Sequence, residues 1–292
     1  MAAPSRSKHA QRALVIKKLP ALIKKHCEVV VPRLQLPVLE TMLYAVCLEN
    51  VPASTAEAAY QRISQLFPDL NEARVSTISE LEPIFAGIED PDLRAFRLRA
   101  VLQYVFDKHY TFELESLRKK TFDIASRQLS KIRHITPFIR NFTLHQVLGV
   151  YLIPLDEATL HALEWLGLVN PGQTLEEAGE SLKGLVRKAE VHTFCYTLRA
   201  LATDPRWKPH FLPPTSAVQL AEGVATPENE DDDRLETALD RLTGLLTGTA
   251  PTKRHKASRS TPRSAATRGG KNQRATSSGE EKTRRRSAKS SR

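Results

Sequence analysis

The sequence predicts an all-α protein that is followed by a basic, disordered tail. Apolar residues recur at three- and four-residue spacing over most of residues 8–212, which is the pattern of amphipathic helices. No stretch alternates convincingly between apolar and polar residues as a half-buried strand would. After Pro213 the chain becomes rich in charged and small polar residues. We therefore expect a helical domain at 1–212, an acidic linker at 213–233, an isolated amphipathic helix at 234–248 and a basic disordered tail at 249–292.

The first half of the helical domain begins with an amphipathic segment. Apolar residues are interleaved with lysines at helical spacing over 8–30, and Pro20 is expected to interrupt this helix. Residues 38–50 are strongly apolar, which predicts a buried helix. Ser54 is a favoured N-cap for the next helix, with Glu57 placed to complete a capping box. Further helices are expected at 76–87, 90–106 and 113–130.

The second half of the domain is expected to begin with a short hairpin at 130–137. A helix from about Phe138 to Leu148 follows it. Asp156 and Thr174 are residue types that favour the N-cap, so each is expected to begin a helix. These helices and the last one of the domain are expected at 156–168, 174–188 and 191–201, which makes about ten short helices in all.

The positive charge of the protein is concentrated at its C-terminal end. The chain carries a formal net charge of +10, but residues 252–292 alone hold fourteen Lys or Arg and two Glu, a charge of +12. The remaining residues therefore sum to about −2. Bulk charge gives no argument that the helical domain binds nucleic acid.

The cysteine content and the hydropathy pattern limit the class of protein. Cys27, Cys47 and Cys195 are odd in number and far apart, so no disulfide framework is indicated. The N-terminal segment lacks an uninterrupted apolar stretch of the secretory type, and no segment is long and apolar enough for a transmembrane helix. These features favour a soluble protein of the cytoplasm.

Three stretches, taken in order, resemble the endonuclease III-like superfamily of base-excision DNA glycosylases. The first is the apolar helix at 39–50, in which Glu49 and Asn50 stand where that family has a Gln-Asn or Gln-Ala step at the DNA surface. The second is 78–102, where a Gly-Ile step precedes an arginine-containing helix, as a Gly-Leu step precedes a Lys-containing helix in the family. The arginines of this helix are Arg94, Arg97 and Arg99.

The third stretch is the most diagnostic. Residues 132–138 fall where the family has its hairpin, and Asp156, counted on without a gap, falls on the family's catalytic Asp at the start of the next helix. The helix that follows ends in Leu166-Gly167-Leu168, which is similar to the family's Arg-Leu-Gly ending. The resemblance covers roughly residues 30–200. It implies a two-lobed helical fold with a degenerate helix-hairpin-helix.

The resemblance assigns the catalytic role to Asp156. A glycosylase flips a nucleotide out of the duplex, and a carboxylate near the sugar stabilises the positive charge that develops as the base leaves. Asp is also a preferred helix N-cap, so a purely structural role for Asp156 is the favoured alternative, and the two roles are compatible because the family's Asp also lies at a helix start. Glu40 and Glu49 are the other carboxylates that we expect near a shared cleft, and Glu49 is the stronger candidate because it ends an apolar helix.

The family's Schiff-base chemistry requires a lysine that this chain lacks. Phe138 occupies the matching position and has no amine with which to attack the sugar. Lys131 precedes the hairpin and is interpreted as a solvated surface residue. No β-lyase activity is expected by the family's route, although monofunctional relatives remove bases without this lysine.

The hairpin itself is expected to be degenerate. Two glycines normally allow its backbone N–H groups to approach a DNA phosphate, and here His134 and Thr136 replace them, while Pro137 removes an N–H donor. One interpretation is that the hairpin still contacts phosphate through Arg133, His134 or Arg140. The alternative is that it is retained only for packing.

The sequence gives no basis for a metal cofactor. Many members of the superfamily hold a [4Fe–4S] cluster with four cysteines, and here Cys195 is the only cysteine beyond residue 47, so the cluster is expected to be absent. His192 and Cys195 have i, i+3 spacing, but no further ligand lies nearby in the sequence, and we expect no metal site there.

The C-terminal tail is the second feature that suggests a DNA partner. It resembles the basic extensions of DNA-associated bacterial proteins, and its cations would give salt-dependent, sequence-independent affinity. A nucleoid-associated location follows from this interpretation, whereas a solubilising tail or one that binds RNA or acidic proteins is the alternative. The tail residues that we expect to contact DNA include Lys253, Arg254, Arg284, Arg285 and Arg286.

Three functional hypotheses remain from the sequence. The first is a monofunctional DNA glycosylase that uses Asp156. The second is a catalytically inactive DNA-binding or damage-sensing protein that is tethered by its tail, and the residue at 138 and the missing hairpin glycines favour it. The third is a helical scaffold whose amphipathic helix 234–246 docks a protein partner.

Overall fold

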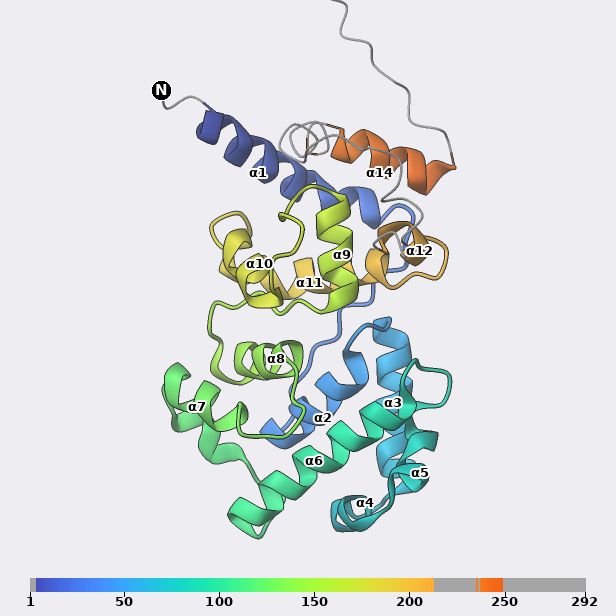
Figure 1. The fold of residues 1–292 in the computed structure, drawn as a ribbon, viewed down its shortest axis with the longest axis vertical. Coiled ribbons are helices and arrows are strands. Elements are labelled where there is room, and N and C mark those ends of the chain that lie inside the picture. Colours follow the sequence, from blue (N-terminus) through green and yellow to red (C-terminus); the bar gives the residue numbers. More distant parts are fainter. Residues whose placement is uncertain (1–3, 213–234, 236, 249–292) are drawn as a thin grey trace, which may run out of the picture. The chain divides into compact units, whose positions relative to one another are not determined.

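The computed structural model describes residues 4–212, 235 and 237–248, with side chains from Lys8 onward (Figure 1). The described residues form thirteen α-helices and three short 3-10 helices and contain no strand. The expected all-α class is therefore confirmed. None of the described helices is long and apolar enough to cross a membrane.

Two hydrophobic cores organise the described part of the chain. The first core is built by residues of the central segment, and the second by residues from both ends. The helices of the first core are α2 (Val38–Leu48), α3 (Ala53–Leu66), α4 (Leu70–Val75), α5 (Ile78–Leu81), α6 (Pro91–His109), α7 (Phe122–Leu129) and α8 (Pro137–Leu148). Two 3-10 helices, Glu82–Phe85 and Glu115–Lys119, complete this core.

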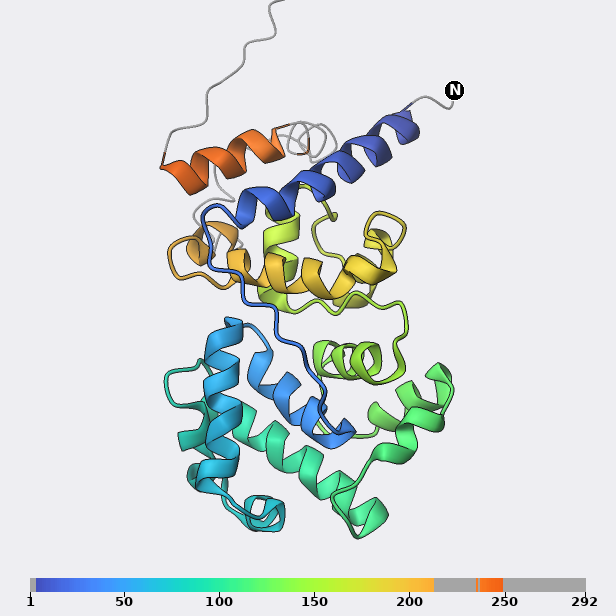
Figure 2. The ribbon, with the colours of Figure 1, turned by 180° about the vertical axis from the view of Figure 1, so that it is seen from behind.

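The second core draws on segments that lie far apart in the sequence. Its helices are α1 (Pro4–Ile23), α9 (Glu157–Trp165), α10 (Leu175–Leu182), α11 (Val191–Ala202), α12 (Lys208–Phe211) and α14 (Ala238–Thr247), with a 3-10 helix at Lys188–Glu190. The chain leaves α1, crosses to the first core through residues 24–37, and returns after α8 (Figure 2). This crossing produces the two-lobed arrangement that the sequence resemblance implies.

Helix α2 lies at the centre of the first core. All of its residues except Glu40 are buried, because the helix is apolar on every side and packs against α3, α6 and α8. Its C-terminal end is directed at the second core, where Asn50 adopts the left-handed conformation at φ 59°. This placement brings Glu49 and Asn50, two of the residues expected in the functional site, close to the second core.

Several helix boundaries differ from the sequence expectation for identifiable reasons. Helix α1 continues through Pro20 and ends at Ile23 rather than near residue 30. Helix α3 begins at Ala53 after Pro52, so Ser54 is not its N-cap. The segment 113–130 forms two helices instead of one, because the backbone is extended at Lys120. The first of the two is fixed to α2 by the Glu115 carboxylate, which accepts a hydrogen bond from Val38 N at 2.7 Å.

Helix α14 packs on the helical domain, although the sequence suggests an isolated helix. Leu242 and Leu246 are buried in the second core, where α14 contacts α1. The Arg241 guanidinium stacks on the Trp165 ring at 4.2 Å and donates to the carbonyl of the same residue. The apolar face proposed for a protein partner is therefore covered by the protein itself. The acidic linker and the basic tail lie outside the described residues.

Candidate active site and nucleic-acid interface

Asp156 is the N-cap of α9, and its side chain is fully buried. Its Oδ1 accepts hydrogen bonds from the Thr159 backbone N–H at 3.1 Å and from the Thr159 hydroxyl at 2.7 Å. Its Oδ2 accepts from the Asn50 backbone N–H at 2.8 Å and is 2.6 Å from Nη1 of Arg199. Four donors of the protein thus occupy both oxygens, and no part of the carboxylate faces solvent.

The Asp156 carboxylate is held in its charged form. Burial alone would raise the pKa of Asp156, but the charge of Arg199 and the hydrogen bonds from Thr159 and Asn50 outweigh burial and lower it. A general acid would need the opposite shift, whereas electrostatic stabilisation of a sugar cation needs this charged form. The site is therefore suited to a permanent anion that neutralises a buried arginine.

Arg199 connects the two cores. It lies on α11, and its side chain is only 4% exposed. Besides the ion pair with Asp156, its Nη1 donates to the carbonyl oxygens of Leu48 at 2.6 Å and Val51 at 3.3 Å, at the C-terminal end of α2. The Leu48 carbonyl is one of those that the last turn of a helix leaves without an intrahelical partner, so Arg199 caps α2 from the other lobe, and the Val51 carbonyl lies in the segment that follows α2.

Phe138 completes this junction. Its ring is 1% exposed and lies under the guanidinium of Arg199, with 4.9 Å between the guanidinium carbon and the ring centroid. This is a cation–π contact in a desolvated place. The position that the resemblance assigns to a reactive lysine therefore supports Arg199 instead.

A second polar cluster surrounds the end of α2. Asn50 accepts a hydrogen bond from Ala158 N on its Oδ1 at 3.0 Å, so it links α2 to α9 through both its backbone and its side chain. Glu49 is 5% exposed and pairs with Arg97 at 2.6 Å. Burial raises the pKa of Glu49 despite Arg97. Neither Glu49 nor Asn50 presents a free side chain at a DNA surface.

Arg94 holds the same helix end from the first lobe. It is 5% exposed and donates to the carbonyl oxygens of Val46, Glu49 and Glu89 at 2.8–3.0 Å. Three backbone acceptors and burial leave no room for a DNA contact. Arg94 therefore fixes the loop before α6 against α2.

The turn between α7 and α8 is ordered, with His134 and Thr136 at the positions where the resemblance places glycines. His134 adopts the left-handed conformation at φ 58°, and its ring packs edge-on against Phe96 with 4.7 Å between centroids. Thr136 is the N-cap of α8, and its hydroxyl accepts from Ile139 N at 3.2 Å. Ile132 is buried beneath the turn. The hairpin is therefore degenerate in sequence, yet His134 and Thr136 give it a defined turn.

The remaining arginines that were expected to contact DNA differ in whether their guanidinium groups are already bound within the protein. Arg140 donates to Glu176 at 2.8 Å and to Ser130 at 3.1 Å, so it is engaged within the protein. Arg133 is exposed on the hairpin, and Arg99 is half-buried on α6. Arg99 and Arg133 line the same hollow on the surface of the first core. The tail residues Lys253, Arg254, Arg284, Arg285 and Arg286 lie outside the described range.

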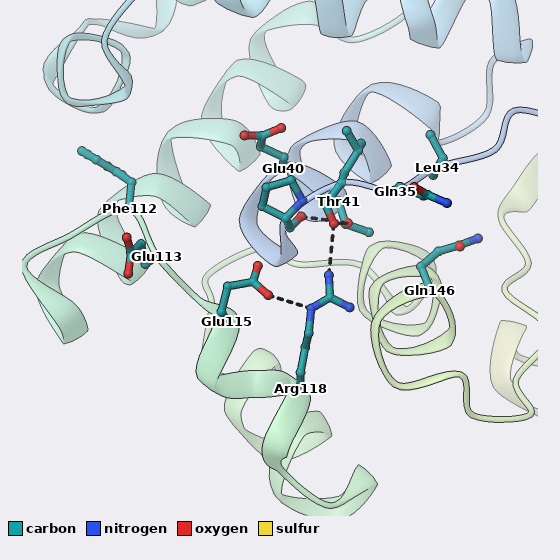
Figure 3. Close-up of a pocket in the computed structure, with 11 residues that line it drawn as sticks. Leu34, Gln35, Glu40, Thr41, Phe112, Glu113, Glu115, Arg118 and Gln146 are labelled. Atoms are coloured by element: carbon teal, nitrogen blue, oxygen red, sulfur yellow. Dashed lines mark hydrogen bonds and ion pairs between the residues drawn. The ribbon is translucent and has the colours of Figure 1, made fainter.

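Glu40 does not share a cleft with Glu49 and Asp156. It stands at the opposite end of α2 and accepts a hydrogen bond from the Tyr60 hydroxyl at 2.9 Å. It lines a cavity of about 790 Å³ together with Glu113, Glu115 and others (Figure 3). In that cavity Arg118 already pairs with Glu115, and the Pro37 end of α2 forms part of the lining. The expectation for Glu40 was therefore wrong, because Glu40 lies in the first turn of α2 and Glu49 is the C-cap at the other end of the helix.

The three cysteines do not fit a four-thiolate iron–sulfur cluster. Cys47 is buried in the first core and Cys27 in the second, so they cannot meet at one metal centre. Burial raises the pKa of the Cys195 thiol to about 12, which disfavours the thiolate that a metal requires. His192 is held between Gln146 at 3.0 Å and the Pro32 carbonyl at 2.9 Å. Among the residues with described side chains, no group of three metal-ligating residues comes together.

Arg199 is the residue that sequence reasoning missed. It occupies an apolar helix between Leu198 and Leu201, both buried, and a lone arginine at such a position indicates a buried ion pair. Its partner could not be named from sequence, because 43 positions and several turns separate it from Asp156. Sequence reasoning also missed that Arg74 of α4 and Lys131 line the same hollow as Arg99, because these residues come from separate segments.

Comparison with known proteins identifies the fold. No protein-family model and no curated protein sequence matches the chain. A solved structure of a trapped endonuclease III–DNA covalent intermediate is similar, with a TM-score of 0.50 and 14% identity over 65% of this chain and 84% of that chain. A thermostable thymine-DNA glycosylase gives a TM-score of 0.49 and 12% identity over 68% of this chain and 89% of that chain. At the 14% identity of the first of these structures the likeness concerns architecture alone, and on that ground the chain has an endonuclease III-like helix-hairpin-helix glycosylase fold.

Proposed function

We propose that this protein is a DNA-binding protein that has kept the glycosylase fold and uses the former catalytic position as a structural junction. The observation that carries the proposal is Asp156, which is 0% exposed and has both oxygens occupied by four donors of the protein. A carboxylate in this state cannot approach the sugar of a flipped nucleotide without breaking the contacts that join the two cores.

The link to DNA rests on the fold and on the hairpin. The similar structure with the TM-score of 0.50 is an endonuclease III bound covalently to DNA. In this chain the hairpin keeps its turn through His134 at φ 58° and exposes Arg133 beside it. A left-handed conformation costs backbone energy for a residue other than glycine. A turn that is formed at this cost supports the proposal that the hairpin contacts DNA.

The monofunctional glycosylase hypothesis is the second candidate. Asp156 does lie at a helix start, as the resemblance requires, and monofunctional chemistry needs no lysine at position 138. Base release would, however, require Arg199 to leave the carboxylate, and this arginine is also held by the carbonyl oxygens of Leu48 in α2 and of Val51 just after it. We therefore favour binding without base removal.

The test is an assay of the full chain on duplexes that contain a single damaged base, an abasic site or no lesion. Binding is measured by fluorescence anisotropy and base release by alkaline cleavage of the same samples. We expect binding to DNA, no base release and no covalent complex after borohydride reduction, because no lysine stands at the Schiff-base position.

The control variant is Asp156→Asn, which keeps the size of the side chain. Base release by the wild-type chain that disappears in a folded Asp156→Asn protein would overturn the proposal and establish the glycosylase. Failure of the wild-type chain to bind any of the duplexes would remove the DNA function altogether.

A further inference from the structure

Two adjoining hollows lie along α6 on the first core. One, of about 680 Å³, is lined by residues of α4, α6 and the hairpin, and the other, of about 590 Å³, by residues of α6, α7 and the segment before it. Tyr104 and Lys131 line both hollows, so the two form one groove. We call it the basic groove after six cations that line it, which are Arg99, Lys108, Lys120, Arg127, Lys131 and Arg133.

Within the described part of the chain, the cations of the basic groove have no carboxylate partner. None of these six cations is ion-paired to a carboxylate among the described residues, whereas Arg97, Arg140 and Lys208 on other surfaces each have an acidic partner. The contacts of the groove cations go to neutral groups, such as Arg99 to the Ser76 carbonyl at 3.3 Å.

Further contacts within the groove are also made to neutral groups. Lys120 donates to the Gln128 amide oxygen, and Arg127 to the Asp123 carbonyl at 3.3 Å. Arg74 also lines the first hollow but is held by Asn71 and Gln103. The carboxylate in the lining, Asp107, accepts a hydrogen bond from Gln103 at 2.6 Å.

This concentration of charge is local. Residues 1–251 together carry a net charge of about −2, so the groove does not reflect a generally basic surface. Positive charge gathered in a concave site raises the local concentration of anions. His109 adds a hydrogen-bonding group, because its Nε2 is buried beside the second hollow without a partner.

The dimensions of the groove suit a nucleic-acid backbone. Nine residues of α6 separate Arg99 from Lys108, which places them roughly 14 Å apart along the helix axis. Phosphates follow one another by about 3.4 Å of axial rise along one strand, so this length faces about four of them. The groove is lined on its other side by Lys131 and Arg133 of the hairpin.

We propose that the basic groove binds the sugar–phosphate backbone of a nucleic-acid strand, and that it does so apart from the Asp156 junction. This inference rests on the proposed DNA function and adds the surface that holds the DNA. Arg94 and Arg97 of α6 point to the junction, whereas Arg99 and Gln103 lie on another face of the same helix. A strand in the groove is bound without opening the Asp156–Arg199 pair.

The experiment compares two full-length variants that carry the same reduction in charge. The groove variant replaces four exposed cations: Lys108→Gln, Arg127→Gln, Lys131→Gln and Arg133→Gln. The control variant replaces four exposed cations of α1 and of the segment that follows it: Lys17→Gln, Lys18→Gln, Lys24→Gln and Lys25→Gln. Thermal unfolding of each variant verifies that the fold is retained.

Affinity is measured with a short labelled duplex and with a single strand of the same sequence, over roughly 50 to 200 mM salt. The slope of log K against log salt becomes shallower by about 0.9 for each duplex phosphate that the protein no longer neutralises. We expect the slope of the groove variant to fall by up to ~3.6 and its affinity by at least about tenfold, while the control variant keeps the wild-type slope. The better of the two ligands shows whether one strand or the duplex is preferred.

The other possible results would overturn either the basic groove or the proposed DNA function. An equal decrease in both variants would show attraction by total charge, and no decrease in the groove variant would place the DNA elsewhere; either result overturns the groove and leaves the proposed function standing. Displacement of DNA by polyglutamate at equal charge concentration would indicate an acidic protein partner and also overturn it. A wild-type chain that binds neither nucleic acid would overturn the proposed function itself.

Discussion

Removal of the Asp156 carboxylate should destabilise the protein strongly. In Asp156→Ala, Arg199 remains a buried charge with a side chain only 4% exposed, and α9 loses its N-cap. Removal of one partner from a buried ion pair typically costs about 3–5 kcal/mol, and removal of a cap about 1 kcal/mol. The Leu48 and Val51 carbonyls still accept from Arg199 and offset part of this cost. We therefore expect a decrease of about 3–5 kcal/mol in the free energy of unfolding.

Urea unfolding followed by tryptophan fluorescence measures this decrease, since Trp165 and Trp207 both pack in the second core. The double variant Asp156→Ala/Arg199→Leu removes both charges. We expect its loss in the free energy of unfolding to be smaller, by about 2–3 kcal/mol, than the sum of the losses in the two single variants. Arg206→Ala is the matched control, because it breaks an ion pair whose arginine is 62% exposed and should cost less than about 1 kcal/mol.

The same pair predicts a pH dependence with a definite sign. The folded-state pKa of Asp156 is lowered, so its contribution is fully present above the ordinary value of 3.8 and is lost as pH falls through the folded-state pKa. The stability difference between wild type and Asp156→Ala should therefore shrink in acid. A destabilisation below about 1 kcal/mol at neutral pH, or a gain in stability, would refute the structural role, because a carboxylate retained for chemistry is commonly a stability cost.

Two further predictions concern the hairpin and α14. His134→Gly should change the free energy of unfolding by less than about 1 kcal/mol, because relief of the left-handed backbone offsets the missing packing on Phe96, whereas His134→Val should destabilise by more than about 1 kcal/mol. Equal urea midpoints for the two variants would contradict the strained turn. Leu242→Ala should cost about 2–4 kcal/mol, because this side chain is fully buried in the second core, while the exposed Thr243→Ala should be nearly neutral. If Leu242→Ala unfolds like wild type, α14 is not part of the cooperative domain.

The degree to which the site could be predicted differs from residue to residue. The helix start at Asp156, the turn at 132–138 and the buried helix before Asn50 are local features, and the structure has all of them. The availability of each side chain is not local. Glu49 and Arg140, expected at a DNA surface, are occupied by Arg97 and Glu176, which lie 48 and 36 positions away in the sequence.

The hairpin shows why residue type alone was insufficient. Replacement of glycine by His134 indicated a degenerate hairpin, yet histidine tolerates the left-handed region better than branched residues do, and the Phe96 ring supports it there. A packing interaction from α6 thus compensates for an unfavourable local choice. The same limit applies to α14, whose amphipathic pattern indicated an apolar face but not that α1 would cover it.

The all-α class, most of the helices and the resemblance to the glycosylase fold could be predicted from the sequence, because apolar periodicity and capping residues act over a few positions of the chain. The tertiary fold was needed to show that Asp156 is sealed beneath Arg199 and that six cations from α6, the segment before α7, α7 itself and the hairpin line one groove. The physical reason is that burial and charge pairing depend on which distant segments meet in space, and no local pattern specifies that meeting.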